Sequence, residues 1–551
     1  MQKSWWKEAI VYQIYPRSFK DSDGDGIGDL QGIISKLDYL KDLGIDVIWL
    51  SPHFKSPNVD NGYDISDYEA IMADFGTMAD FDEMLAAIHQ KGMKLIIDLV
   101  VNHSSDEHFW FQESRKSKDN PYRDYYIWKD KKPNDWIGFF SGSAWEFEAL
   151  SEEYYLHYFV KKQPDLNWEN PKLRQEIYKM MRFWLEKGVN GFRMDVISLI
   201  SKDQSFPDFP ANRFGDLSYY ANGPRVHEFL QEMNQEVLSK YDCMTVGEAF
   251  GVAAEQANDY VGHDRHELNM IYHFDHAVPR DEICFVEPKP EFKLAELKEI
   301  FRKWDKAIGN NGWNTIYFGN HDNARMLSRF GNTGVFREAS AKMLATVLLT
   351  LRGTPYLYQG DEIGMSNADF QAIAEYNDVQ VLNAYKTLVE GGNYTTEQFL
   401  AASNQIARDH ARTPMQWNDT INAGFSTSEK TWLKTNNNYL SVNVLSQESD
   451  KDSVLNFYKK LIHLRKNTPA LMYGQYLDLR PRCNRIWFYE RTFEQEKYLI
   501  MTNFTAQKQS FEVKQIVEKK ELVLANSLVE SDLSNQIFYL KPYESRIYRI
   551  N

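Results

Sequence analysis

Short apolar runs that end in polar residues recur along most of the chain. They cover residues 44–52, 93–103, 190–196, 244–250, 313–323 and 353–362. Segments with helical spacing separate them, among them residues 80–92, 171–188 and 337–349. Alternation of strands and helices over this length predicts a parallel α/β fold. A (β/α)8 TIM barrel is the expected architecture, because the polar residues gather at the carboxyl ends of the strands, where barrel enzymes build their sites.

Two stretches interrupt this alternation. Residues 104–170 are rich in Tyr, Trp, Asp and Ser and predict a domain inserted after the third strand, while residues from about 365 to 412 predict an irregular insertion. After residue 479 the pattern becomes alternating, which is typical of a small antiparallel β domain. The predicted domains are a barrel at 1–103 and 171–478, an inserted domain at 104–170, and a C-terminal antiparallel β-sandwich at 479–551.

Composition narrows the class of protein. The chain has 551 residues, enough for two or three domains, of which 43% are hydrophobic and 26% charged, as in globular proteins. Aromatic residues reach 14%, and their flat apolar faces make sugars or aromatic molecules plausible ligands. The net charge of −15 argues against a nucleic-acid partner, because basic patches supply affinity for phosphates.

The cysteines and the first residues bear on the compartment. Cys243, Cys284 and Cys483 form no CxxC motif, and their odd number favours reduced thiols in a reducing compartment. The opening stretch "MQKSWWKEAIVYQIYPRSF" lacks the apolar core of a signal peptide, and no apolar run is long enough to span a bilayer. We therefore predict a cytoplasmic monomer or weak oligomer without a membrane partner.

Acidic residues end three of the strand-like runs. Asp195, Glu248 and Asp322 are flanked by apolar residues, an expensive place for a charge unless it is paired or functional. One such carboxylate alone is more often a satisfied ion pair than a catalyst. Three together suit glycoside hydrolysis, in which one carboxyl group is nucleophile or base and another protonates the leaving oxygen.

The neighbours of two of these acids predict different protonation states. Arg193 and Asp195 are two residues apart on one strand, so both side chains should point to the same face. The cation would keep Asp195 ionised. Glu248 lies among apolar residues in "VGEAF", which predicts the raised pKa that an acid catalyst needs.

Four motifs resemble, in order, the core motifs of the α-amylase superfamily of glycoside hydrolases, family 13. They are "DLVVNH" (98–103), "GFRMDV" (191–196), "VGEAF" (246–250) and "FGNHDN" (318–323). "QPDLNWENP" (163–171) is similar to a further motif of the oligo-1,6-glucosidase branch, and the similarity to that branch and to dextran glucosidases runs along the whole chain.

The resemblance implies roles for the three acids. Asp195 would be the nucleophile, Glu248 the general acid/base, and Asp322 the residue that stabilises the distorted sugar. A retaining mechanism through a covalent glucosyl-enzyme follows, with the Asp195 and Glu248 carboxyl groups about 5–5.5 Å apart.

The resemblance also implies a set of residues around the substrate. His103, Arg193 and His321 would surround the first sugar, and an Asp60–Arg412 pair would close the pocket so that only a chain terminus fits. A plain salt bridge between loops is the alternative for that pair. The full predicted set is Asp60, Tyr63, His103, Phe159, Gln163, Arg193, Val196, Phe250, Tyr272, Arg280, His321, Asn323 and Arg412.

Residues 21–29, "DSDGDGIGD", imitate the start of an EF-hand loop, although position 32 is Gly rather than the closing Glu. Relatives in this branch use the loop for a structural Ca2+ or Mg2+. We predict Ca2+, with Mg2+ as the alternative ion, and a metal-free Asp/Gly-rich turn as the other interpretation. The predicted ligands are Asp21, Asp23, Asp25, Ile27 and Asp29.

Val196 bears on the linkage. In this branch Val after the nucleophile accompanies α-1,6 cleavage and Thr accompanies α-1,4 cleavage; Val lacks a hydroxyl that could bond the second sugar. The alternative is that Val is simply a favourable strand residue. The preferred function is therefore an exo-acting α-glucosidase that hydrolyses isomaltose and isomalto-oligosaccharides.

Other functions stay open. Phe250 and Tyr272 resemble an aromatic pair of sucrose isomerases, although of their isomerisation loop only "HAVPRDE", with Arg280, is present. Transglucosylation, action on sucrose or α-1,4 links, and trehalose-6-phosphate hydrolysis are further alternatives, the last without an identifiable phosphate-binding cluster. A non-catalytic carbohydrate-binding role is more distant, because the chain keeps all three acids.

Overall fold

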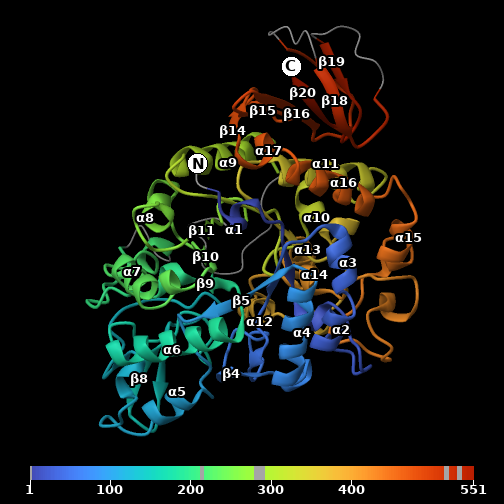
Figure 1. Ribbon diagram of the computed structural model, residues 1–551. Helices are drawn as coiled ribbons and strands as arrows, with labels where there is room; N and C mark the ends of the chain where they lie inside the picture. Colours follow the sequence, from blue (N-terminus) through green and yellow to red (C-terminus); the bar gives the residue numbers. More distant parts are fainter. Residues whose placement is uncertain (1–2, 211–215, 278–291, 514–519, 530–536, 551) are drawn as a thin grey trace.

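The computed structural model describes residues 3–210, 216–277, 292–513, 520–529 and 537–550 (Figure 1). Its centre is a sheet of parallel strands in the order β11-β10-β9-β5-β2-β1-β13-β12. The Thr315 hydroxyl on β12 donates to the Ile271 carbonyl on β11 at 2.9 Å, which joins the two ends of this order and closes the barrel. The strands are β1 (Val11–Ile14), β2 (Val47–Leu50), β5 (Lys94–Val100), β9 (Gly191–Asp195), β10 (Met244–Glu248), β11 (Met270–Tyr272), β12 (Thr315–Ile316) and β13 (Thr354–Tyr358).

Helices cover the outside of the barrel (Figure 1). The helix before β9 shows why the chain folds this way locally: α6 (Pro171–Lys187) starts with Asn170 as N-cap and Pro at its first position. It ends at Gly188, whose φ of 113° suits the left-handed C-cap. The other principal barrel helices are α3 (Leu37–Leu43), α4 (Met78–Gln90), α7 (Val226–Glu236), α8 (Ala257–Val261), α9 (Leu294–Ile308), α11 (Arg337–Thr350) and α16 (Val454–Lys466).

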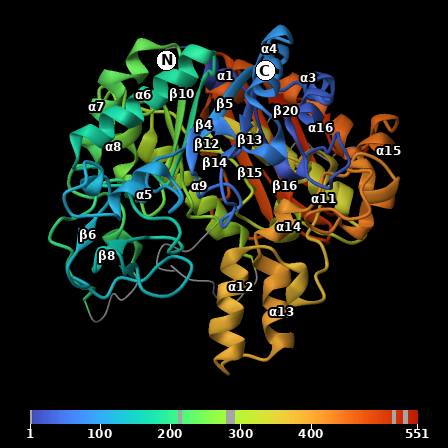
Figure 2. The same cartoon turned by 90° about the horizontal axis from the view of Figure 1, so that it is seen from below.

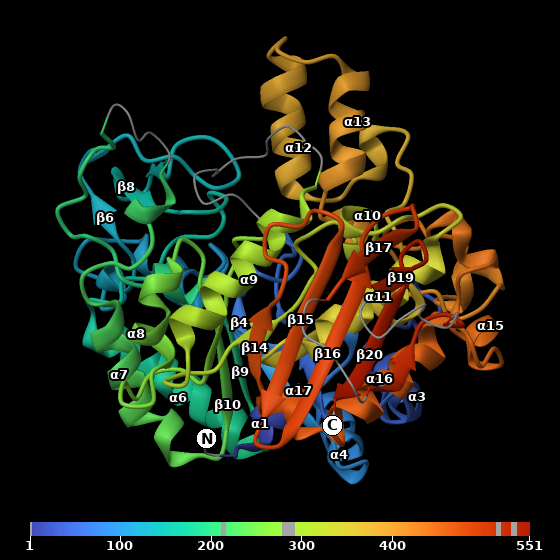
Figure 3. The same cartoon turned by 90° about the horizontal axis from the view of Figure 1, so that it is seen from above.

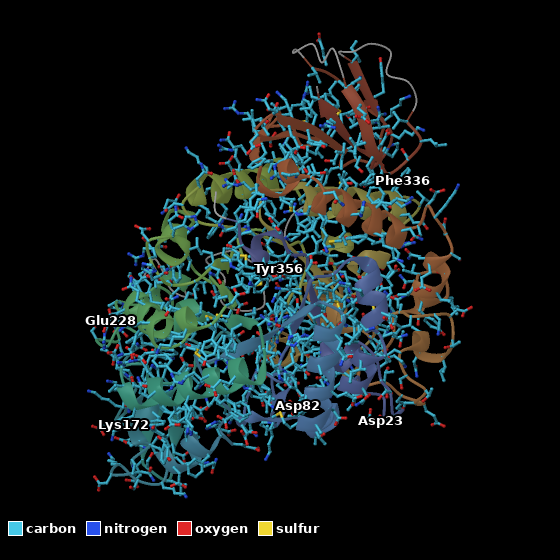
Figure 4. The ribbon with its side chains drawn as sticks, in the orientation of Figure 1. Asp23, Asp82, Lys172, Glu228, Phe336 and Tyr356 are labelled. Carbon is cyan, nitrogen blue, oxygen red and sulfur yellow. The ribbon has the colours of Figure 1, made fainter. Side chains whose placement is uncertain are left out.

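The TIM barrel prediction is confirmed, but most strands are shorter than the apolar runs that predicted them. The run 313–323 contains only the two residues of β12, and its remainder is loop that carries His321 and Asp322. β1 and β11 were not among the predicted runs. Inside the barrel, Tyr356 of β13 is 2% exposed and lies near the middle of the molecule (Figure 4).

Residues 104–170 interrupt the barrel after β5. They contain α5 (Phe109–Ser114) and a three-stranded antiparallel sheet in the order β6-β8-β7. A bridge from His103 to Asp165 ties the end of this segment to the chain just after β5, and a bridge from Tyr126 to Leu166 lies within the segment. The sheet strands are β6 (Trp128–Lys129), β7 (Trp145–Glu148) and β8 (Glu153–Leu156).

The prediction of an irregular insertion at about 365–412 is wrong, because the structure forms a helical hairpin there. Its arms are α12 (Val379–Tyr385), capped by Asp378, and α13 (Thr396–Ile406), whose Thr395 and Gln398 form a capping box. The hairpin projects from the barrel on the same side as β6 and β8 (Figures 2 and 3). The helices are short, so their apolar residues show too little helical periodicity for the sequence to predict them.

The chain ends in an antiparallel β domain with two layers, as predicted. A five-stranded sheet in the order β14-β15-β16-β20-β18 faces the two-stranded sheet β17-β19 across an apolar core that includes Phe488, Met501 and Phe538. Its strands are β14 (Gln475–Asp478), β15 (Ile486–Phe493), β16 (Glu496–Asn503), β17 (Gln509–Glu512), β18 (Lys520–Ala525), β19 (Ile537–Leu540) and β20 (Ser545–Ile550).

Two further features concern membrane-spanning helices and the cysteines. Among the described residues, the helices are too short or too polar to cross a bilayer. Cys243 and Cys483 carry free thiols, and Cys284 lies outside the described residues.

Candidate active site

The three predicted acids come from neighbouring parts of the barrel's carboxyl edge. Asp195 is the last residue of β9, Glu248 is the last residue of β10, and Asp322 follows β12. Asp195 and Glu248 are only 7% and 4% exposed. Parallel strands end at one edge of a barrel, so residues far apart in sequence meet there.

Arg193 holds the two carboxyl groups together. Its guanidinium lies 2.8 Å from Asp195 Oδ1 and 2.8 Å from Glu248 Oε1. A third carboxylate, Asp98 on β5, lies 2.6 Å from the same guanidinium and also accepts from the Trp49 indole at 2.7 Å. Arg193 and Asp195 therefore share a face as predicted, but the cation does not single out Asp195.

Burial and mutual repulsion shape the protonation of this pair. Burial raises the pKa of Asp195 well above its usual value, and the Glu248 carboxyl raises it further. Burial also raises the pKa of Glu248, against the pull of Arg193. Each carboxyl group also lies 2.8 Å from the Arg193 guanidinium, so the two groups and the cation form one buried cluster. The direction for Glu248 is the predicted one. The direction for Asp195 is opposite, because burial and the Glu248 carboxyl outweigh the effect of Arg193.

Asp322 is held as an anion by two arginines and one histidine ring. Its carboxylate lies 2.9 Å from Arg412, 3.2 Å from Arg408 and 2.9 Å from the His321 ring. Burial alone would raise the pKa of Asp322, but His321 and the two arginines bring it well below its usual value. Its side chain keeps 25% exposure, so one face of this anion stays accessible.

The predicted Asp60–Arg412 ion pair is not formed. Asp60 lies 3.3 Å from Arg408, one helical turn earlier, while Arg412 donates to Asp322 and to the His321 carbonyl. Arg408 also binds Asp378 at 2.5 Å, at the foot of the helical hairpin. Burial raises the pKa of Asp60 to about 6, even though Arg408 opposes the shift.

Tyr63 and His321 form a stacked pair, with ring centroids 5.2 Å apart and planes 5° from parallel. The Gln13 amide donates to His321 Nδ1 at 2.7 Å, which leaves the proton on Nε2, 2.9 Å from Asp322. Burial lowers the pKa of His321 to about 4, so the ring is neutral at pH 7.

The inserted segment contributes Phe159 and Gln163. The Gln163 amide donates to Asp60 at 3.1 Å and lies 3.3 Å from His103 Nε2. The Phe159 ring contacts the His103 ring at a centroid distance of 4.8 Å. His103 also bonds the Tyr63 carbonyl, so these predicted residues form one contiguous group.

The aromatic pair predicted beside the acid is not formed. The Phe250 ring meets Phe139 and Phe274 edge-on at 5.4 and 5.6 Å. Tyr272 turns into the barrel and packs against Tyr317 and Tyr356. Tyr272 is the last residue of β11, whereas Phe274 lies beyond the strand end.

The remaining predicted site residues vary in position. Asn323 is buried next to Asp322 and donates to its carbonyl at 2.9 Å. Val196 lies just beyond β9 with φ 35° and ψ 39°, so the interpretation that it is there as a strand residue is wrong. Arg280 lies outside the described residues.

In the loop at 21–29, three carboxylates gather. Asp21, Asp23 and Asp29 offer oxygen atoms within 4.8 Å of one another, a donor set that suits Ca2+ or Mg2+. Asp25 lies outside this group, and its carboxylate accepts from the Ile27 N–H at 2.7 Å. Figure 4 shows Asp23 at the edge of the molecule, away from Tyr356 in the barrel.

Sequence reasoning missed several residues of the site, chiefly Asp98, Arg408, Asp378 and Gln13. Asp98 carried a usable signal, because it lies in "DLVVNH" and stands opposite Arg193 in the register of β5 and β9. Arg408 and Arg412 are four residues apart in "ARDHAR", and that spacing could not decide which of them reaches Asp60.

Comparisons with known proteins agree with this geometry. Residues 13–474 match the family model "Alpha amylase, catalytic domain", and residues 486–547 match the SusG C-terminal domain. The chain is 53% identical to an oligo-1,6-glucosidase of Bacillus cereus and 52% identical to one of Parageobacillus thermoglucosidasius, covering 100% of each chain. Among solved structures it resembles a mutant isomaltulose synthase from Erwinia rhapontici bound to sucrose, with a TM-score of 0.97, 45% identity and full coverage of both chains.

Proposed function

This chain belongs to the family of the α-amylase catalytic domain, and on that premise we propose that it is an exo-acting, retaining α-glucosidase for α-1,6 bonds. Isomaltose and isomalto-oligosaccharides would be its substrates, cleaved at the non-reducing end. The carrying observation is the pair of buried carboxyl groups, Asp195 and Glu248, each 2.8 Å from the same Arg193 guanidinium. That closeness favours the retaining arrangement, since inverting enzymes keep their carboxyl groups roughly 6.5–9.5 Å apart.

The proposed first step starts with the proton on Glu248 and the negative charge on Asp195, where Arg193 stabilises the anion. Glu248 gives a proton to the glycosidic oxygen as the bond from that oxygen to C1 breaks. Asp195 forms a bond to C1 from the opposite face and becomes the glucosyl ester. Arg193 stays between the two groups and neutralises the anion that forms on Glu248. In the second step Glu248 takes a proton from water, and the water oxygen replaces Asp195 at C1.

The surroundings support an exo mode of action. Asp322 is ionised and partly exposed, so it can accept hydrogen bonds from sugar hydroxyls. The ion pairs of Arg408 with Asp60 and Asp378 connect the loops at the strand ends to the helical hairpin. We propose that Asp60 and Arg408 close one end of the substrate pocket, so that it admits only a terminal glucose.

The sharpest test is a product analysis with several disaccharides. Purified protein is incubated with isomaltose, panose, maltose, sucrose and trehalose 6-phosphate, and the products are followed by chromatography and NMR. We expect the fastest turnover with isomaltose and first release of α-glucose. Initial β-glucose would overturn the retaining mechanism, and faster turnover of maltose would overturn the linkage.

Sucrose isomerisation is the second candidate, favoured by the similarity to sucrose-bound isomaltulose synthase and by the contact between the Phe250 and Phe274 rings after β10 and β11. The sucrose arm of the same experiment separates the two. Isomerisation would yield a new disaccharide, whereas hydrolysis yields glucose and fructose. Asp195→Asn should abolish turnover in either case while sugar binding remains, which distinguishes an enzyme from a binding protein.

We further propose that the loop at 21–29 binds a structural Ca2+. Asp21, Asp23 and Asp29 would hold it, and their carboxylates are already oriented by hydrogen bonds from within the loop. Burial would raise the pKa of Asp21, but the Ser426 hydroxyl and backbone N–H groups bring it below its usual value, so a charged ligand is ready. The positive charge of the ion would hold these three carboxylates together. The ion would take no part in the reaction.

A further inference from the structure

Val196 has a backbone conformation that its side chain disfavours. It lies in the left-handed region, with φ 35° and ψ 39°, directly after the last residue of β9. A β-branched residue is strained there, and such strain persists only where surrounding contacts enforce it. The position therefore needs a physical explanation beyond the termination of a strand.

The Val196 N–H reaches the second oxygen of the proposed acid. This N–H donates to Glu248 Oε2 at 2.8 Å, while Oε1 lies 2.8 Å from Arg193. Both oxygens of Glu248 thus have a fixed donor, and both donors come from the adjacent strand or its end.

Contacts on three sides hold Val196 in place. Its side chain is 7% exposed and packs in a cluster with Phe139 of the inserted segment and Phe250 of the loop after β10. The Leu199 N–H donates to the Val196 carbonyl at 2.8 Å. The Ser198 hydroxyl donates to the Phe250 carbonyl at 2.8 Å, which ties the loops after β9 and β10 together.

We propose that the backbone N–H of Val196 is a positioning donor that holds Glu248 in line with the glycosidic oxygen. The proposal rests on the proposed function in one respect, the role of Glu248 as proton donor. As the proton leaves Glu248, a carboxylate forms, and a hydrogen bond to a charged acceptor is stronger than one to a neutral acceptor. The N–H therefore stabilises the transition state more than the ground state.

The test replaces this one N–H by oxygen. Val196 is exchanged for its α-hydroxy analogue, which turns the amide bond into an ester and keeps the side chain. We expect kcat/KM for isomaltose to fall about tenfold or more, as when one fixed donor is removed from a reacting site. The basic limb of the pH profile should move up by roughly one unit, because the lost hydrogen bond favoured the charged form of Glu248.

A substrate whose cleavage needs no acid catalyst distinguishes a loss of Glu248 positioning from general damage to the active site. Dinitrophenyl α-glucoside has a leaving group that departs without a proton, so its kcat/KM should stay within about twofold. Equal losses on both substrates, or a basic limb that does not move, would overturn the proposal.

Two controls use the same kind of residue. The α-hydroxy analogue at Val189, whose N–H donates to the Trp184 carbonyl at 3.1 Å, should leave the pH profile unchanged. Val196→Gly keeps the N–H in a conformation that glycine adopts freely, so its basic limb should match the wild type. A shift with Val196→Gly as large as with the ester would assign the effect to side-chain packing and overturn the proposal.

If the unmodified protein fails to hydrolyse isomaltose, the proposed function falls and the positioning proposal is tested on whichever disaccharide it does cleave. The two failures are therefore distinguishable. The first appears in the wild type, and the second appears only in the comparison between wild type and ester.

Discussion

At the residue scale, Arg408 has more partners in the site than the sequence indicated. It contacts Asp60, Asp322 and Asp378, which come from three separate segments. Its guanidinium carbon also lies 4.9 Å from the centre of the Phe140 ring. The cation therefore compensates several buried acids at once. Its removal leaves uncompensated charge, which is far more costly in a buried site than at a surface.

Arg408→Gln should lower kcat/KM for isomaltose by roughly 100-fold, mainly through a higher KM, because Asp60 and Asp378 lose their counter-ion. Steady-state kinetics on purified protein measures it. Arg302→Gln is the matched control, since Arg302 forms a surface pair with Glu299 on α9 and its loss should cost nothing measurable. A near-normal KM in Arg408→Gln would show that the prediction is wrong.

Val196→Thr tests the linkage at the same scale. Thr has nearly the shape of Val and keeps the branched β-carbon, but adds a hydroxyl that can bond a second sugar. We expect the ratio of kcat/KM for isomaltose to that for maltose to fall by about tenfold. Parallel assays of both disaccharides provide the measurement, and an unchanged ratio would remove Val196 from the explanation of linkage.

At the element scale, the site is assembled where β5, β9 and β10 end, with two insertions beside it. The inserted segment supplies Gln163, and the helical hairpin supplies Asp378. The two insertions also touch directly, because Asn383 of α12 donates to the Phe140 carbonyl at 3.1 Å. Barrel strands thus carry the reacting acids, and the connections between strands carry the groups that we expect to select the substrate.

The loop at 21–29 gives a prediction at this scale. Removing bound metal with a chelator should lower the melting temperature by several degrees, because an ion that binds only the folded state stabilises it. Added Ca2+ should restore the temperature, and Asp21→Asn should abolish the response. Asp38→Asn, at a side chain with 91% exposure, is the control expected to respond like the wild type. An unchanged melting temperature after chelation would count against a metal.

At the scale of the whole molecule, one buried histidine links stability to pH. His53 is fully buried, and its ring stacks on Phe81 at 5.1 Å and meets Trp184 edge-on at 5.6 Å. Within the described part of the chain, neither ring nitrogen has a partner at hydrogen-bond geometry. Burial lowers the pKa of His53 to about 3, so the folded protein holds the ring neutral well below the pH at which an unfolded chain would protonate it.

The sign follows from proton counting. Between the pKa of about 6.5 in the unfolded chain and about 3 in the folded protein, only the unfolded state binds the proton, so this group's stabilising contribution is full above that range and falls as pH decreases. From pH 7 to pH 5 the loss is about 2 kcal/mol. His53→Phe should therefore show a smaller drop in melting temperature between these pH values than the wild type.

Phe81→Leu is the control for His53→Phe. It disturbs the same aromatic contacts without removing a titratable group, so its melting temperature should be lower by a similar amount at both pH values. Equal pH dependence in the wild type and His53→Phe would contradict the assignment.

The sequence by itself determined the barrel, the C-terminal β domain and the positions of the three acids. Strand–helix alternation and carboxylates at strand ends are local patterns, and each can be recognised from a few consecutive residues. The short strands β1 and β11 and the helical hairpin were missed, since their local patterns are weak.

Only the tertiary structure decided which charges pair. Arg408 rather than Arg412 reaches Asp60, Phe274 rather than Tyr272 faces Phe250, and Arg193 binds both Asp195 and Glu248. The bond from the Val196 N–H to Glu248 is likewise a contact between two segments. Ion pairs and burial depend on distances between segments far apart in the chain, and those distances are fixed by packing rather than by any local pattern.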